Sequence, residues 1–165
     1  MKSIIQNVVV LINSSEASIH AAQYGIILSK MYRCNLKAVY VVDTASIKYL
    51  TLGKFFIETE AKMYEDNLQI EGQRYLDYVK DLGKAKGIKV ETELRKGAVW
   101  SEVIMAADEM NANLILLGGY KSEMNSSPIE KHDAVSSSNR DILSNAHCSV
   151  LVVREKMIEQ LYKLV

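Results

Sequence analysis

The chain has 165 residues with 20 basic and 20 acidic side chains, and its 48% hydrophobic content is ordinary for a globular protein. A chain of this length is expected to form one domain that needs no disulfide or structural metal. Zero net charge argues against binding nucleic acid or an anionic membrane, and no apolar run reaches the roughly 18 residues that a membrane span needs.

The first part of the chain predicts two strands and one helix. Val8–Ile12 is an unbroken β-branched run, as expected of a strand buried on both faces. Ser14 and Ser15 can cap a helix over Ala17–Met31. A second strand over Leu36–Val42 is followed by a stretch, Asp43–Phe56, that we expect to be irregular.

The middle of the chain predicts a long helix over Ile57–Lys86 that stops near Gly87. The next strand, Ile88–Leu94, alternates apolar and polar residues and should lie near an edge of the sheet. A helix over Val99–Met110 and a short apolar strand over Leu114–Leu117 follow.

The last part begins with Tyr120–Ser136, which is longer than an ordinary connecting loop without secondary structure and is therefore either functional or disordered. We then expect a short helix over Ser137–Asn145, a strand over Val150–Val153 and a terminal helix over Glu155–Val165. In the first helix Ala21, Ile27, Leu28 and Met31 are expected to face inward. The long helix carries a broad apolar stripe of Met63, Leu68, Tyr75, Leu76, Val79 and Leu82, and the terminal helix has apolar residues at helical spacing: Met157, Ile158, Leu161, Tyr162 and Leu164.

Strands that alternate with helices predict right-handed βαβ units and a parallel sheet covered on both faces. The expected fold is a single-domain α/β, doubly wound open sheet of five parallel strands in the order 3-2-1-4-5. Residues 1–154 would form the domain and residues 155–165 a C-terminal helical extension. That extension either covers a dimer seam, crosses to a partner, or packs back on its own subunit.

Open parallel sheets bind ligands beyond the carboxyl ends of their strands. The start of a following helix also favours an anion, through its N–H groups and its dipole. This grouping suits a mononucleotide, although serines at a helix start are also ordinary caps. The candidate residues are Asn13, Ser14, Val42, Asp43, Gly97, Gly118 and Gly119, with Ser136, Ser137 and Ser138 at the start of the fourth helix.

Four segments carry a resemblance to a known family. They are NVVVLINSSEAS at the start, YVVD after the second strand, KGAVWSEVIMAADEMNANLILLGG before the long loop, and ILSNAHCSVLVVR near the end. In sequence and spacing the chain resembles the universal stress protein family over nearly its whole length. The resemblance implies a stress-response domain, in some members ATP-binding, that commonly dimerises.

The resemblance also implies a nucleotide loop, which in ATP-binding members reads GxxG, nine residues, then Gly-Ser/Thr. Gly118 matches the first glycine and Ser137 matches the hydroxyl residue. Lys121 and Ser136 replace the other two glycines, and 14 residues separate them. Each brings a Cβ that hinders close backbone approach, although the Lys121 ammonium could neutralise phosphate charge. Asn13 also replaces the family's acidic residue near the sugar and base.

The function expected from these features is a homodimeric regulatory domain that binds ATP, with Mg²⁺, or AMP. An unpaired Val150–Val153 edge would invite aggregation, so the dimer would pair this strand with its copy. The alternative is a nucleotide-independent dimer that acts through protein contacts. The location expected is cytoplasmic, with neither nucleic acid nor a membrane as partner.

No catalytic or metal-binding group is predicted. A tyrosine separates the paired glycines from Lys121, so the segment is no P-loop. The histidines are scattered, with His20 expected on a helix surface, and slow ATP hydrolysis is only a third option. Cys34 and Cys148 should behave as small hydrophobes. Tyr120 either stacks on a base or closes the pocket.

Overall fold

A computed structural model describes residues 2–54, 57–119, 137–154 and 157–165. It contains one parallel sheet whose order, β3-β2-β1-β4-β5, confirms the expected fold class and places the third strand at an edge. The strands are β1 (Asn7–Ile12), β2 (Asn35–Asp43), β3 (Val90–Gly97), β4 (Leu114–Gly118) and β5 (Ser149–Val153). The helices are α1 (Glu16–Tyr32), α2 (Thr44–Leu52), α3 (Glu58–Ala85), α4 (Val99–Glu109), α6 (Ser137–Asn145) and α7 (Ile158–Leu164).

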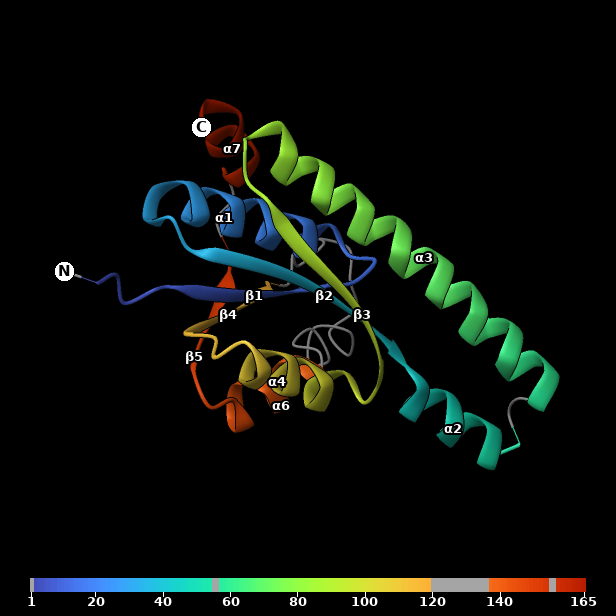
Figure 1. The fold of residues 1–165 in the computed structure, drawn as a ribbon. Coiled ribbons are helices and arrows are strands. Elements are labelled where there is room, and N and C mark those ends of the chain that lie inside the picture. Colours follow the sequence, from blue (N-terminus) through green and yellow to red (C-terminus); the bar gives the residue numbers. More distant parts are fainter. Residues whose placement is uncertain (1, 55–56, 120–136, 155–156) are drawn as a thin grey trace, which may run out of the picture.

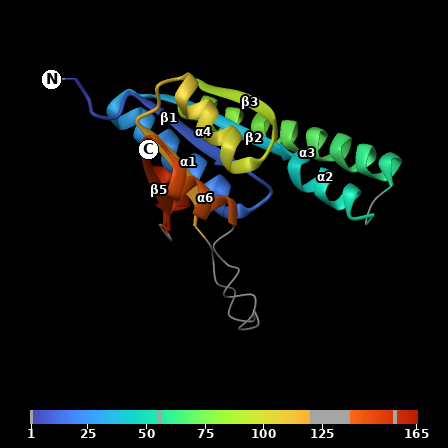
Figure 2. The same ribbon diagram turned by 90° about the horizontal axis from the view of Figure 1, so that it is seen from below.

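Helices cover both faces of the sheet, with α1 and α3 on one side and α4 and α6 on the other (Figures 1 and 2). Successive residues of a strand point to opposite faces, which divides the interior into two apolar layers. In β1, Val8 and Val10 join the layer beneath α1 and α3, while Val9 and Leu11 join the layer beneath α4 and α6. The unbroken apolar run of β1 is thus explained by burial on both sides.

The segment between β2 and α3, predicted to be irregular, contains the helix α2. Asp43 begins it, because its carboxylate accepts hydrogen bonds from the Ser46 backbone N–H at 3.0 Å and from the Ser46 hydroxyl at 2.7 Å. Such an acidic cap satisfies amides that a helix start leaves without partners. The prediction was wrong because it relied on apolar periodicity, which the short sequence after Asp43 largely lacks, whereas the Asp43 cap is what starts the helix.

The third strand lies further along the chain than predicted, over Val90–Gly97 instead of Ile88–Leu94. Gly87 has a φ of 73°, and the Ile88 N–H still donates to the Gly83 carbonyl that ends α3, which delays the start of the strand. At its other end, β3 continues until Gly97 lies opposite Asp43 of β2.

The C-terminal helix α7 packs back on its own subunit, against α1 and the end of α3 (Figure 1). Ile158 is buried, and the Tyr162 hydroxyl donates to the Leu82 carbonyl at 2.6 Å. The Lys30 ammonium donates to the Val165 carbonyl at 2.8 Å. Of the alternatives that the sequence left open for this helix, packing on its own subunit is the one observed within this chain.

Several side-chain predictions were wrong. His20 was expected on the surface, but only 8% of it is exposed, because α7 covers this part of α1. Met31, predicted to face inward, is exposed, and so is Met63 of the apolar stripe on the long helix. Of the apolar residues at helical spacing near the C-terminus, Met157, Leu161 and Leu164 are exposed in this chain. The short α7 has a single face against α1, so part of its apolar sequence stays outside. No described helix has the length and apolar character required to cross a membrane.

Candidate functional site

A hydrogen-bonded turn follows β1 and starts α1. The Asn13 side-chain oxygen accepts from the Ser15 N–H at 2.8 Å and also from the Ser15 hydroxyl. The Ser18 hydroxyl donates to the Asn13 carbonyl at 2.9 Å, and the Asn13 N–H donates to the Ser18 hydroxyl oxygen at 3.1 Å. Ser14 is exposed beside them. This turn fixes the N-terminus of α1, the positive end of its dipole, next to the end of β1.

The end of β4 lies against the same helix start. A Cβ added to Gly118 would come within 2.6 Å of the Ala17 carbonyl carbon and 2.7 Å of the Ser18 nitrogen, so only glycine fits there. On its other side the Gly118 carbonyl accepts from the Asn139 side-chain amide of α6 at 3.3 Å. The first turns of α1 and α6 therefore meet at Gly118.

A basic side chain lies next to Gly119. The Gly119 N–H donates to the Val153 carbonyl at 2.9 Å, and a Cβ on Gly119 would come within 2.8 Å of Arg154 Cγ. Arg154 is exposed. It was not among the predicted site residues, and neither was Asn139. The only signal for Arg154 was its place directly after the last strand, beside a glycine that follows the neighbouring strand.

Two further predicted residues form a second group along the same edge of the sheet. Asp43 and Gly97 lie opposite each other where β2 and β3 end. Asp43 caps α2, and Gly97 has a φ of 144° with Glu102 packed so close that a Cβ would come within 2.8 Å of its carboxylate. Val42, also predicted, has a fully buried side chain and can present only its backbone to a ligand.

The remaining predicted residues belong to the long loop and the start of α6. Lys121 and Ser136 lie outside the described residues, as does Tyr120. Ser137 is the first residue of α6, and Ser138 is half-buried in its first turn. The structure thus brings Asn13, Gly118, Gly119 and the start of α6 together, and it places Asp43 and Gly97 further along the edge.

The chemistry of the first group is that of an anion site. The starts of α1 and α6 both reach Gly118, and the first N–H groups of a helix lack partners within that helix. In α1 the Ser15 hydroxyl oxygen already accepts from the Ser18 N–H at 3.2 Å, so the first turn of α6 is the better anion donor. The Arg154 guanidinium adds a permanent positive charge and donors suited to phosphate. The close contacts of Gly118 and Gly119 are made with protein atoms, so the described structure needs both glycines for packing. Helix-start N–H groups and an arginine are the kinds of donor that suit a phosphate group.

Neither cysteine has the properties of a nucleophile. Cys34 is buried. Burial and the nearby Asp108 charge raise the pKa of the Cys148 thiol, which disfavours the reactive thiolate.

The comparisons with known proteins agree with the fold. A model of the Universal stress protein family matches residues 5–154. The universal stress protein MJ0531 of Methanocaldococcus jannaschii is 28% identical over 154 residues, which cover 93% of this chain and 85% of that protein. The solved structure of hypothetical protein MJ0577 superposes with a TM-score of 0.74 at 18% identity and covers 93% of this chain and 99% of its own.

Two solved structures of similar fold contain nucleotides. A universal stress protein in complex with cAMP has a TM-score of 0.59 at 20% identity and covers 92% of this chain and 98% of its own. A universal stress protein from Archaeoglobus fulgidus in complex with dAMP has a TM-score of 0.62 at 15% identity and covers 92% of this chain and 100% of its own. At these identities the structures show a shared fold alone.

Proposed function

We propose a function on the premise that the chain belongs to the universal stress protein family, whose model matches residues 5–154. The chain is a regulatory stress-response protein that binds an adenine nucleotide, ATP or AMP, where β1 and β4 end. It acts by binding and not by catalysis, and ATP would enter with Mg²⁺. The cytoplasmic location expected from the sequence is part of the same proposal.

One observation carries this proposal: the first turns of α1 and α6 meet at Gly118, with Arg154 beside the next residue. Phosphate groups would take the first-turn N–H groups of α6, the Ser138 hydroxyl and the Arg154 guanidinium. The sugar and base would lie toward Asn13 and the end of β2. The cAMP and dAMP complexes of proteins with this fold support the choice of adenine nucleotides.

We also propose a homodimer formed through β5. This strand is at the edge of the sheet, and Val150, Leu151 and Val152 are only half-buried within one chain. An unpaired apolar edge strand favours pairing with another strand, and a two-fold axis would let it pair with its own copy. The dimer seam would then continue the sheet from one subunit into the other.

The proposal is tested by calorimetric titration of nucleotide-free protein with AMP and with ATP plus Mg²⁺. We expect one nucleotide per chain and about tenfold weaker binding by Arg154→Gln, which loses a charged phosphate contact. Arg74→Gln, which removes an exposed arginine from α3, is the matched control and should bind like the wild type. Absence of heat for both nucleotides at millimolar concentration would refute the proposal.

A second candidate function is a dimer that works through protein contacts without any nucleotide. It is favoured by the packing of Gly118 and Gly119 against protein atoms and by the Asn13 side-chain oxygen, which accepts from Ser15. Under this alternative, no nucleotide titration produces heat, and Arg154→Gln leaves every property of the dimer unchanged.

A further inference from the structure

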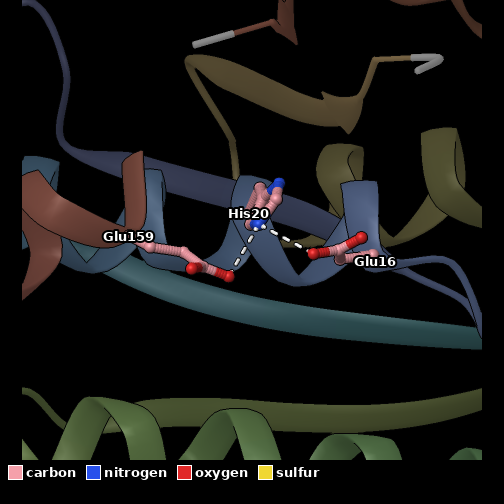
Figure 3. A group of neighbouring side chains, drawn as sticks. All are labelled: Glu16, His20 and Glu159. Carbon is pink, nitrogen blue, oxygen red and sulfur yellow. Dashed lines mark hydrogen bonds and ion pairs between the residues drawn. The ribbon is translucent and has the colours of Figure 1, made fainter. Parts of the chain in front are cut away.

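Three side chains of metal-ligating types, from two helices, meet where α7 packs on the N-terminal half of α1 (Figure 3). Glu16 and His20 lie four residues apart on one face of α1, and Glu159 comes from α7. His20 Nε2 is 3.1 Å from Glu159 Oε1 and 3.7 Å from Glu16 Oε1. Among the described residues this is the one group of three such side chains whose ligating atoms all lie within 4.8 Å of one another.

The donor atoms of this group suit a divalent cation. The Nε2 atom of a neutral imidazole either donates one proton or offers one lone pair. A neutral His20 therefore cannot donate a hydrogen bond from Nε2 to each of the two carboxylates. The two carboxylates repel each other across a short distance, next to an imidazole whose side chain is only 10% exposed. A divalent ion among the three ligating atoms would offset this repulsion and use the His20 lone pair.

The two distances from His20 Nε2 suit the ligand sphere of zinc. Zinc binds histidine nitrogen and carboxylate oxygen at about 2.0–2.2 Å in a tetrahedron, which places neighbouring ligand atoms roughly 3.4 Å apart. The two distances from His20 Nε2, 3.1 and 3.7 Å, lie on either side of that value. One imidazole with two carboxylates is a donor set that suits zinc better than the all-oxygen set preferred by magnesium or calcium.

We propose that Glu16, His20 and Glu159 bind one zinc ion, with water in the fourth position, and that this ion fastens α7 to α1. Glu16 and His20 lie within residues 5–154, which the family model matches, whereas Glu159 lies beyond them in α7. The buried Ile158 and the hydrogen bond from Tyr162 already hold α7 in place. The ligands are therefore brought together before the metal arrives.

The test is a zinc titration of the full chain after removal of metals, at neutral pH, by calorimetry. We expect one zinc ion per chain in the wild type and at least about tenfold weaker binding in Glu159→Gln, which loses one ligand. Glu159 is exposed and at the end of the chain, so this variant should fold. His20→Asn should also lose binding, but because His20 is buried, circular dichroism must first show that the variant is folded.

The matched control is His147→Asn, because His147 also pairs with a carboxylate, Asp108 at 3.0 Å, but on the surface and with no third such ligand in the part of the chain that the structure describes. It should bind zinc like the wild type. Amide hydrogen exchange supplies a second readout, since zinc should slow exchange in α7 of the wild type and not in Glu159→Gln. The proposal is overturned if the wild type binds no zinc, or if Glu159→Gln binds as tightly as the wild type.

Discussion

Gly118, at the end of β4, accepts a hydrogen bond at 3.3 Å from the side-chain amide of Asn139 in α6. The same glycine touches the first turn of α1, so a single residue joins two helix starts at the switch point of the sheet. In an open α/β sheet this is the place where ligands bind. The relationship links the packing of the fold to the proposed function.

The close approach at Gly118 predicts a clear stability effect. Gly118→Ala places a Cβ against backbone atoms of Ala17 and Ser18, which cannot move aside easily, and should lower the free energy of unfolding by about 1–3 kcal/mol. Gly87→Asn is the control, because a Cβ there meets nothing within 4 Å and asparagine tolerates the φ of 73°. Denaturant unfolding measures both, and equal stabilities for Gly118→Ala and wild type would contradict the packing account.

The cap of α2 predicts that substituting Asp43 destabilises this helix without affecting the strands. Asp43→Ala removes both hydrogen bonds to Ser46 and should weaken α2 by about 1 kcal/mol. Amide hydrogen exchange in Thr44–Leu52 should become faster while exchange in the strands stays unchanged. Asp77→Ala, which removes a carboxylate from the surface of α3, should leave α2 exchange as it is. If exchange in α2 does not respond to Asp43→Ala, then Asp43 does not hold the helix start.

The strands were the most predictable part of the fold, because runs such as Val8–Ile12 are apolar without interruption and only a doubly covered sheet can bury them. α2 could have been predicted from Asp43 and Ser46, whose three-residue spacing is that of a cap, but its sequence has little apolar periodicity. The start of β3 was misjudged because Ile88 is apolar yet still belongs to the turn that ends α3.

The candidate site was predictable only in part, since its residues lie far apart in sequence. Gly118 and Asn13 could be placed together because parallel strands end on the same edge. The contact between Gly119 and Arg154 depends on the register of β4 with β5, which no local pattern encodes. The burial of His20 depends on a helix 139 residues further along the chain.

The charged network around Arg95 predicts that replacing Arg95 lowers the free energy of unfolding far more than replacing the next residue, Lys96. Arg95 binds Glu93 at 2.7 Å, Glu102 at 2.7 Å and Glu109 at 3.0 Å, and only 12% of its side chain is exposed. Burial alone would lower the pKa of the guanidinium, but its hydrogen bonds to Glu102, Glu109 and Glu93 raise it. Arg95→Met removes the cation that Glu102 and Glu109 share, while Glu93 keeps its ion pair with Lys37 at 3.3 Å. This loss should cost about 2–3 kcal/mol.

The control for Arg95 is the next residue. Lys96 pairs with Glu65 at 3.0 Å, but its side chain is 45% exposed, so Lys96→Met should change the free energy of unfolding by no more than about 0.5 kcal/mol. Unfolding experiments on both variants decide the matter, and similar losses for the two would show that burial of the network does not set its contribution.

The raised pKa of Cys148 predicts slow thiol chemistry. Burial is the main cause and the Asp108 charge adds to it, so the thiolate forms only at higher pH than in a free cysteine, whose pKa is about 8.5. Alkylation of the native protein should therefore reach half its maximal rate above that pH, and Asp108→Asn should move the profile down. Cys148→Ser is the control for reaction elsewhere, and a profile like that of the free amino acid would contradict the burial account.

The central claim, a nucleotide site where α1 and α6 meet at Gly118, is tested most directly by backbone amide NMR of the labelled chain during titration with AMP. The account predicts saturable shifts concentrated at Asn13–Ser18, Gly118, Gly119 and the first turn of α6, while the amides of α3 stay unchanged. No shifts at millimolar AMP, or saturable shifts confined to another face of the sheet, would contradict it.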